Sequence, residues 1–325
     1  MVEVLELAEH VLVRGGLILD IFEAAELEAA CYVQGSRLSR LMRLARRRGE
    51  MRSEAQLREH YRVERELADR LRSAGRAERR VLYSALYDEL MRRVPHHPML
   101  NARGREERER AVEHQGAFLN GFLAPDSVFM EIGPGDCALA LRAASMVSKV
   151  YAIDVSEQIT REVTPPPNFR LILSDGCSIP VQAGTVDVAF SDQLMEHLHP
   201  DDAKEQLRNI YASLAPHGVY ICVTPNRLYG PRDISAYFDD VATGFHLREY
   251  AARDLRDLLL AAGFRRVHFF AGARGWFVRF PGWLLFAVER LLGTLPHRLR
   301  RALADRAPMR ALLGVRLAAF KSGGR

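Results

Sequence analysis

The sequence predicts an α/β protein in which a parallel sheet, flanked by helices, follows a helical extension. From about residue 128 onward, short β-rich runs alternate with helix-length segments. Before that, residues 17–93 contain no proline and repeat apolar residues every three or four positions. The composition, 48% hydrophobic and 27% charged, is that of a globular protein. We therefore expect a helical extension at 1–98 and a sheet domain at 99–325.

Seven short runs rich in β-branched and aromatic residues are the expected strands. They are residues 128–132, 149–153, 169–173, 186–190, 219–223, 265–270 and 314–320. Helices are expected at 103–122, 138–146, 201–214 and 250–262, the last of them ended by Gly263. Because strands that alternate with helices pair in parallel, we expect the first six strands to be parallel.

An insertion at 272–311, between the last two expected strands, combines apolar side chains such as Trp276, Phe280 and Trp283 with many arginines. Residues 264–325 hold 13 Lys and Arg against 2 Asp and Glu. This composition suits an element that contacts an anionic membrane surface, and the insertion begins at the carboxyl edge of the sheet, where it would also be a lid. The alternative is that its apolar residues pack in the core. No stretch is apolar and long enough to span a bilayer.

The first expected strand runs into a turn, residues 131–136, with the sequence EIGPGD. Gly133 and Gly135 let the backbone approach a ligand at the start of the next helix. Their spacing also satisfies the dinucleotide pattern, with Asp154 at the ribose position. Glu131 and Asp136, however, would repel a pyrophosphate and suit a net positive ligand. An NAD-binding oxidoreductase is therefore disfavoured.

Five short motifs follow one another in a fixed order over residues 105–271. They are Glu131-x-Gly133-x-Gly135, Ala152–Val155, Ser174–Gly176, Ser191–Leu198 and His217–Tyr220. Together they resemble the class I S-adenosylmethionine-dependent methyltransferases. The resemblance implies a Rossmann-like, doubly wound, seven-stranded methyltransferase sheet in which residues 314–320 run antiparallel between strands five and six. It also implies S-adenosyl-L-methionine as the cofactor.

The resemblance assigns cofactor contacts to residues at the ends of the first four strands. Asp154 would accept both ribose hydroxyls, and Asp175 would accept the adenine amine. The alternatives are a helix cap for Asp154 and a simple Asp-Gly turn for Asp175. Tyr87, in the helix before the sheet, is a further candidate. The predicted cofactor-binding residues are Glu131, Gly133, Gly135, Asp154, Val155, Asp175, Gly176 and Asp192.

His197 and His246 are the candidate catalytic residues, because an imidazole titrates near neutral pH and can take a proton from an acceptor hydroxyl. For His197 two alternatives stay open, a structural role and a cation ligand beside Asp192 and Glu196. His246 is expected to face the acceptor. We expect no resident metal, since the four cysteines lack the spacing of a zinc site.

The function expected from these features is O-methylation of a small-molecule or amphiphilic, lipid-linked acceptor. Planar-amine methylation is disfavoured, because residues 191–194 read SDQL where a proline-rich, aromatic turn would be needed. The alternatives are a non-catalytic scaffold and, less favoured, the oxidoreductase. We expect a cytoplasmic protein, peripheral at the inner membrane face through residues 272–311, with no nucleic-acid partner.

Overall fold

The computed structural model describes residues 40–47, 49–100, 102–156, 165–273 and 275–322. The chain divides into two compact units, Met1–Glu54 and Ala55–Arg325. The described part of the first unit contains helix α3 (Arg40–Arg47), and Arg46 donates a hydrogen bond of 2.7 Å to the carbonyl oxygen of Glu50. The predicted helices before residue 40 lie outside the described residues, and the predicted boundary at residue 98 stays a prediction.

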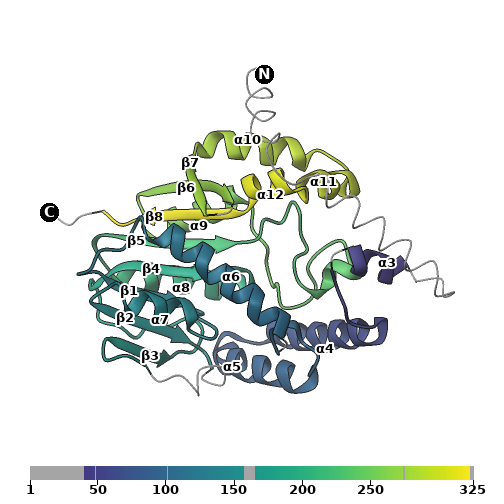
Figure 1. Ribbon diagram of the computed structural model, residues 1–325, viewed down its shortest axis with the longest axis horizontal. Coiled ribbons are helices and arrows are strands. Elements are labelled where there is room, and N and C mark those ends of the chain that lie inside the picture. The colour runs from purple at the N-terminus through teal and green to yellow at the C-terminus, as the bar shows by residue number, and fades with distance from the viewer. Residues whose placement is uncertain (1–39, 48, 101, 157–164, 274, 323–325) are drawn as a thin grey trace. The chain divides into compact units, whose positions relative to one another are not determined.

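The second unit is built on one eight-stranded sheet with the order β3-β2-β1-β4-β5-β8-β6-β7 (Figure 1). Neighbouring strands from β3 to β5 pair in parallel, and β8 runs antiparallel to both β5 and β6. The strands are β1 (Val128–Ile132), β2 (Lys149–Asp154), β3 (Phe169–Leu173), β4 (Val186–Asp192), β5 (Leu214–Thr224), β6 (Arg266–Ala273), β7 (Trp276–Phe280) and β8 (Val315–Phe320). The predicted Rossmann-like sheet is confirmed, including the antiparallel return of the last strand.

The sheet has one strand more than the seven predicted. Strand β7 lies in the segment interpreted as an insertion, and it forms an antiparallel hairpin with β6 in which Ala273 pairs with Trp276. Gly275, with a φ of +84°, supplies the left-handed residue that so short a turn needs. The sequence pattern did not predict this strand, because its aromatic residues are equally compatible with an exposed apolar surface.

Helices cover both faces of the sheet, which makes it doubly wound. On one face, α6 (Ala102–Leu119) and α7 (Ala138–Ala144) pack residues such as Phe118 and Leu139 against Phe129 of β1. On the other, α8 (Pro200–Ser213) and α9 (Ala252–Ala261) pack against the alternate strand residues, such as Met130. Because side chains of a strand point alternately to the two faces, consecutive residues of β1 serve the two cores. All the strands named as parallel end at one edge of the sheet.

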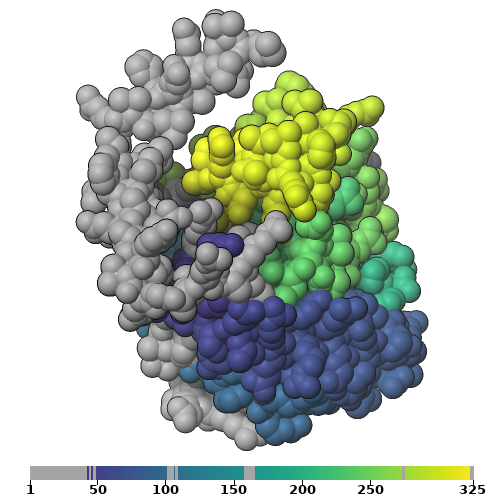
Figure 2. Space-filling view, turned by 90° about the vertical axis from the view of Figure 1, so that its right-hand side faces the viewer, coloured from purple at the N-terminus to yellow at the C-terminus, as the bar shows by residue number. Residues whose placement is uncertain are grey.

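Two helices of the predicted extension, α4 (Glu54–Ser73) and α5 (Arg76–Arg93), lie at the carboxyl edge. Figure 2 views this edge, with α4 and α5 in blue, residues 225–250 in green and the C-terminal helices in yellow. The guanidinium of Arg79, on α5, donates to both carboxylate oxygens of Asp202 on α8, at 2.6 and 2.7 Å. Both side chains are buried, so the bidentate pair fixes α5 against the sheet.

The rest of the predicted insertion forms three helices, α10 (Gly282–Gly293), α11 (His297–Ala304) and α12 (Ala307–Leu313). Its apolar residues divide between buried and exposed positions, and the predicted membrane contact stays a prediction. Leu285 and Leu292 are buried in the core, whereas Trp276 and Trp283 are 82% and 71% exposed. Among the described helices of the chain, none is both long and apolar enough to cross a membrane.

Candidate active site

The turn between β1 and α7 has the backbone conformation that its glycines predict. Gly133 and Gly135 have φ values of +70° and +56°. A Cβ atom at Gly133 would lie 3.1 Å from Cδ1 of Leu194, so this position is both left-handed and closely packed. The Gly133 N–H donates to the carbonyl oxygen of Ile153 at 2.9 Å, which ties the turn to the end of β2.

A cluster of carboxylates surrounds this turn. Glu131 is buried, and its Oε2 atom has no hydrogen-bond partner among the described residues. Burial raises the pKa of Glu131 well above its usual range, and the nearby charges of Asp192 and Asp136 raise it further. Burial also raises the pKa of Asp192 to about 6, although Gln193, Arg316 and Gln115 lower it. The strand ends therefore form a site in which several carboxylates lie close together without enough positive charge nearby to neutralise them.

Asp154 ends β2 beside the same turn. Its Oδ1 accepts hydrogen bonds from the N–H groups of Val155 and Ser156, at 2.6 and 3.2 Å. Burial raises the pKa of Asp154, and the N–H groups of Ser156, Val155 and Gly135 oppose this rise. The carboxylate is thus held at the edge of the sheet at the predicted position, and its contact with a ribose stays a prediction.

Asp175 has the local contacts of its alternative interpretation. Its Oδ1 accepts from the N–H groups of Cys177 and Ser178, at 3.0 and 2.7 Å, and its Oδ2 accepts from Arg80 at 2.8 Å. Burial raises the pKa of Asp175, but these backbone donors and Arg80 outweigh it and the pKa lies below its ordinary value. Gly176, with φ +83°, leaves room for the ring of Tyr83, since a Cβ there would lie 2.7 Å from Cδ2. The geometry favours the turn, and the adenine contact stays a prediction.

The two candidate histidines lie together, next to Glu196. The ring centroids of His197 and His246 are 4.9 Å apart and the rings meet edge to face. Glu196 is fully buried and accepts a hydrogen bond of 2.8 Å from Oγ1 of Thr224. One ligand atom of each of these three residues lies within 4.8 Å of the others, so they could hold a metal ion. Asp192, which the sequence grouped with Glu196 and His197, is not part of this cluster.

The pKa values of the two histidines are shifted in opposite directions. The carbonyl oxygen of Phe245 lies 3.1 Å from Nδ1 of His197 and can only accept, so this nitrogen carries the proton. Burial and the neighbouring positive charge of His246 lower the pKa of His197 to about 3. Nδ1 of His246 lies 2.8 Å from the Glu249 carboxylate. Burial lowers the pKa of His246, but the Glu249 contact and the charge of Glu196 outweigh it, and the pKa lies above its ordinary value.

Tyr87 packs over the histidines from α5. Its ring stacks on that of Phe245, with centroids 5.1 Å apart, and meets His197 edge to face at 6.0 Å. Burial raises the pKa of Tyr87 above its ordinary range. Tyr87 thus lies beside the candidate histidines, and its contact with a cofactor stays a prediction.

Three residues of the site were missed in the sequence. Gln115 of α6 donates to Asp192, and the Arg316 side chain, on β8, carries a positive charge near the same carboxylate. Both come from elements far from β4 in the sequence, and no local pattern links them. Glu249 is different, because His246 and Glu249 lie three residues apart, a spacing that often brings two side chains together. This pair could therefore have been predicted from the sequence.

Comparison with known proteins gives one family match. Residues 130–222 match the family model described as a methyltransferase domain. These residues run from within β1 to within β5 and so contain the carboxyl ends of β1, β2, β3 and β4. No curated protein matches the chain at a significant level.

Solved structures with a similar chain include a Haemonchus contortus phosphoethanolamine N-methyltransferase in complex with phosphomonomethylethanolamine and S-adenosylhomocysteine, at 15% identity and TM-score 0.43. That match covers 65% of this chain and 52% of the other, about half its length. An S-adenosylmethionine-dependent methyltransferase of Mesorhizobium loti matches at 15% identity and TM-score 0.43, covering 64% and 98%. The [4+2]-cyclase SpnF matches at 19% identity and TM-score 0.41, covering 65% and 82%.

Proposed function

The chain carries a methyltransferase domain with the class I, S-adenosylmethionine-dependent fold, and from this premise we propose that it methylates an oxygen of a small-molecule or lipid-linked acceptor. One observation carries the proposal that the cofactor binds at the end of β1. The buried Glu131 has a carboxylate oxygen that finds no hydrogen-bond partner in the part of the chain that the structure describes, and the charges of Asp136 and Asp192 lie nearby. A net positive ligand relieves this repulsion, and an anionic dinucleotide increases it.

The cofactor supplies a methyl group that is already activated on a sulfonium, so the protein needs mainly to bind, orient and remove a proton. Asp154 would hold the ribose, and the Gly133–Gly135 turn would admit the ligand close to the backbone. Glu131 and Asp192 would compensate its positive charge. These residues come from the ends of three neighbouring strands, β1, β2 and β4, the edge where ligands bind in open parallel sheets.

For the proton, we assign the base role to His246 in preference to His197. Glu249 fixes Nδ1 of His246 and leaves Nε2 to take the proton from an acceptor hydroxyl, which is the arrangement of a base oriented by a carboxylate. The carboxylate also stabilises the imidazolium that results. Among the described residues His197 has no carboxylate at ion-pair distance, and the charge of the neighbouring His246 opposes its protonation.

Calorimetric titration of the parent protein with S-adenosylhomocysteine and, separately, with NAD tests the proposed function. Binding of the first ligand without the second supports a methyltransferase. Binding of NAD alone would make the protein an oxidoreductase, and binding of neither would leave a non-catalytic scaffold with the same fold.

The exposed apolar residues of the C-terminal segment support a peripheral membrane contact for the same protein. Trp276, Trp283 and Leu291 are 82%, 71% and 68% exposed, and β7 is the outer strand of the sheet. Tryptophan beside arginine suits the boundary between anionic headgroups and acyl chains.

Liposome sedimentation tests this contact. We expect binding to anionic vesicles that falls as salt rises, and loss of binding when Trp276 and Trp283 are both changed to Ser. Val81→Ser is the matched control, since Val81 is 72% exposed on α5. Equal binding by the double variant and the control would contradict a membrane role for this segment.

A further inference from the structure

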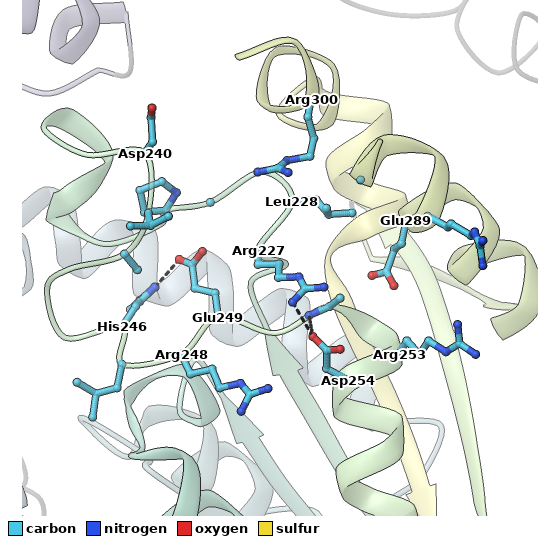
Figure 3. A pocket seen from close by; sticks show the side chains of 18 of the residues that line it. Arg227, Leu228, Asp240, His246, Arg248, Glu249, Arg253, Asp254, Glu289 and Arg300 are labelled. Atoms are coloured by element: carbon cyan, nitrogen blue, oxygen red, sulfur yellow. Dashed lines mark hydrogen bonds and ion pairs between the residues drawn. The ribbon is translucent and has the colours of Figure 1, made fainter. Parts of the chain in front are cut away.

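A cavity of about 590 Å³ opens beside His246. It is lined by the chain after β5, the start of α9, and helices α10 and α11, and His246 forms part of its wall (Figure 3). Leu228, Val241 and Phe286 add apolar surface. The cavity is therefore large enough for a small organic molecule and reaches the residue assigned as the base.

Acidic residues of the cavity wall are already engaged by other groups of the protein. Each of the four carboxylates that line the cavity lies within hydrogen-bond or ion-pair distance of a neighbouring residue. The pairs are Glu249 with His246 at 2.8 Å, Glu289 with Asn226 at 2.6 Å, Asp254 with Arg227 at 3.1 Å, and Asp240 with His297 at 3.3 Å. Each of these acids therefore has a partner within the protein.

Arginines of the cavity wall have fewer partners than its acidic residues. Four of them have no carboxylate within ion-pair distance among the described residues, and these are Arg248, Arg253, Arg290 and Arg300. Arg300 goes further, because its Nε atom is buried without any hydrogen-bond partner in the described part of the chain. In Figure 3 its guanidinium extends from α11 into the space facing the His246–Glu249 pair.

We propose that this cavity binds the phosphoryl group of the acceptor, with Arg300 as its principal partner. Guanidinium groups match tetrahedral phosphate oxygens through paired N–H donors, and they are hydrated weakly enough to bind in a partly buried site. The apolar wall takes the organic part, and the hydroxyl to be methylated lies at the His246 end. This assignment rests on the proposed function, since it names the acceptor of the same site.

Calorimetry with phenyl phosphate, at fixed ionic strength, tests the proposal. We expect the parent to bind this probe, to bind phenol and benzoate at least about 10-fold more weakly, and to lose about 10-fold in affinity on Arg300→Gln. Arg298→Gln is the matched control, because Arg298 is exposed on the same helix and does not line the cavity. Near-ultraviolet circular dichroism establishes that each variant is folded.

Vesicles of phosphatidic acid and of phosphatidylcholine then distinguish a lipid from a soluble phosphoryl compound. A lipid acceptor is supported if the protein binds phosphatidic acid and Arg300→Gln, but not Arg298→Gln, weakens this binding. A soluble phosphoryl acceptor is supported if only the binding of phenyl phosphate depends on Arg300 in this way. The proposal is overturned if neither probe binds, if benzoate binds as well as phenyl phosphate, or if Arg300→Gln and Arg298→Gln have the same affinity for the probes.

The two proposals fail separately. Titration of the same proteins with S-adenosylhomocysteine that shows binding, without any binding of the phosphate probes, removes only the phosphoryl site. Phosphate binding by a protein that binds no S-adenosylhomocysteine would remove the methyltransferase function, and with it the assignment of this cavity to an acceptor.

Discussion

Glu64, on helix α4, accepts a hydrogen bond of 2.9 Å from the backbone N–H of Phe245, 181 residues later in the chain. The other carboxylate oxygen lies 2.8 Å from Nε2 of His60, and both side chains are buried. The carbonyl of the same Phe245 accepts from His197, and the next residue is His246. A helix that precedes residues 130–222, which match the methyltransferase model, thus holds the loop that carries both histidines.

Replacing Glu64 with Ala is expected to destabilise the protein by about 2 to 4 kcal/mol, because the Phe245 N–H and His60 lose a buried partner. Glu66→Ala is the matched control on the same helix. Glu66 pairs with Arg93 and its side chain is 51% exposed, so its loss should change the free energy of unfolding by less than about 1 kcal/mol. Urea unfolding measures both, and equal losses would contradict a special role for Glu64.

Glu64 also gives that loss a pH dependence. Burial raises its pKa, but the hydrogen bond and charge of His60 and the N–H of Phe245 outweigh this, and the folded-state pKa lies below the ordinary value of 4.5. The carboxylate therefore stabilises the fold above the unfolded-state pKa, and this contribution is lost as the pH falls through the folded-state pKa. The difference between Glu64→Ala and the parent should shrink in acid.

Glu196 should act in the opposite direction. Burial raises its pKa from 4.5 to about 7, although the charge of His246 opposes this. The folded protein then holds a proton that the unfolded chain has lost, so stability present below pH 4.5 falls as the pH rises towards 7. We expect Glu196→Gln to flatten the pH dependence of the unfolding free energy by on the order of 3 kcal/mol between pH 4 and 8.

Urea titrations at several pH values check this expectation, with Glu113→Gln, an exposed carboxyl on α6, as the control. The control should keep the parental pH dependence. If Glu196→Gln does so too, the fold does not raise the pKa of the Glu196 carboxyl.

His246→Ala is expected to lower turnover about 10² to 10⁴-fold, measured as release of S-adenosylhomocysteine. Since Glu249 raises the pKa of His246, the base form should appear only as the pH rises through that raised value. Glu249→Gln removes the carboxylate, so the acid limb of the rate profile should move to lower pH. NMR titration of the imidazole gives the same shift without an acceptor.

His197→Ala supplies the contrast. With a pKa of about 3, His197 is neutral throughout the working range, and its loss should cost less than about 10-fold in turnover. A larger loss for His197→Ala than for His246→Ala would reverse the assignment, and full activity of both variants would exclude a histidine base.

The features that could be predicted from the sequence are those set by interactions between residues close together in the chain. Local patterns located the strands well, since β1 and β3 have the predicted bounds and β8 differs by one residue. Gly133 and Gly135 were readable because a left-handed turn needs glycine. Contacts such as Glu64 with Phe245 join distant segments, and no local pattern records them. Strand β7 was missed because five residues with three aromatics have no unique periodicity.

The central claim, that the end of β2 and the turn after β1 bind an S-adenosyl cofactor, is tested most directly by calorimetric titration of Asp154→Ala with S-adenosylhomocysteine. Without this acceptor two ribose hydroxyls would be left unpaired, and we expect a loss of about 2 to 4 kcal/mol in binding free energy. Asp257→Ala, which removes an exposed acid on α9, should bind as the parent does. Unchanged affinity in a folded Asp154→Ala protein would contradict the account.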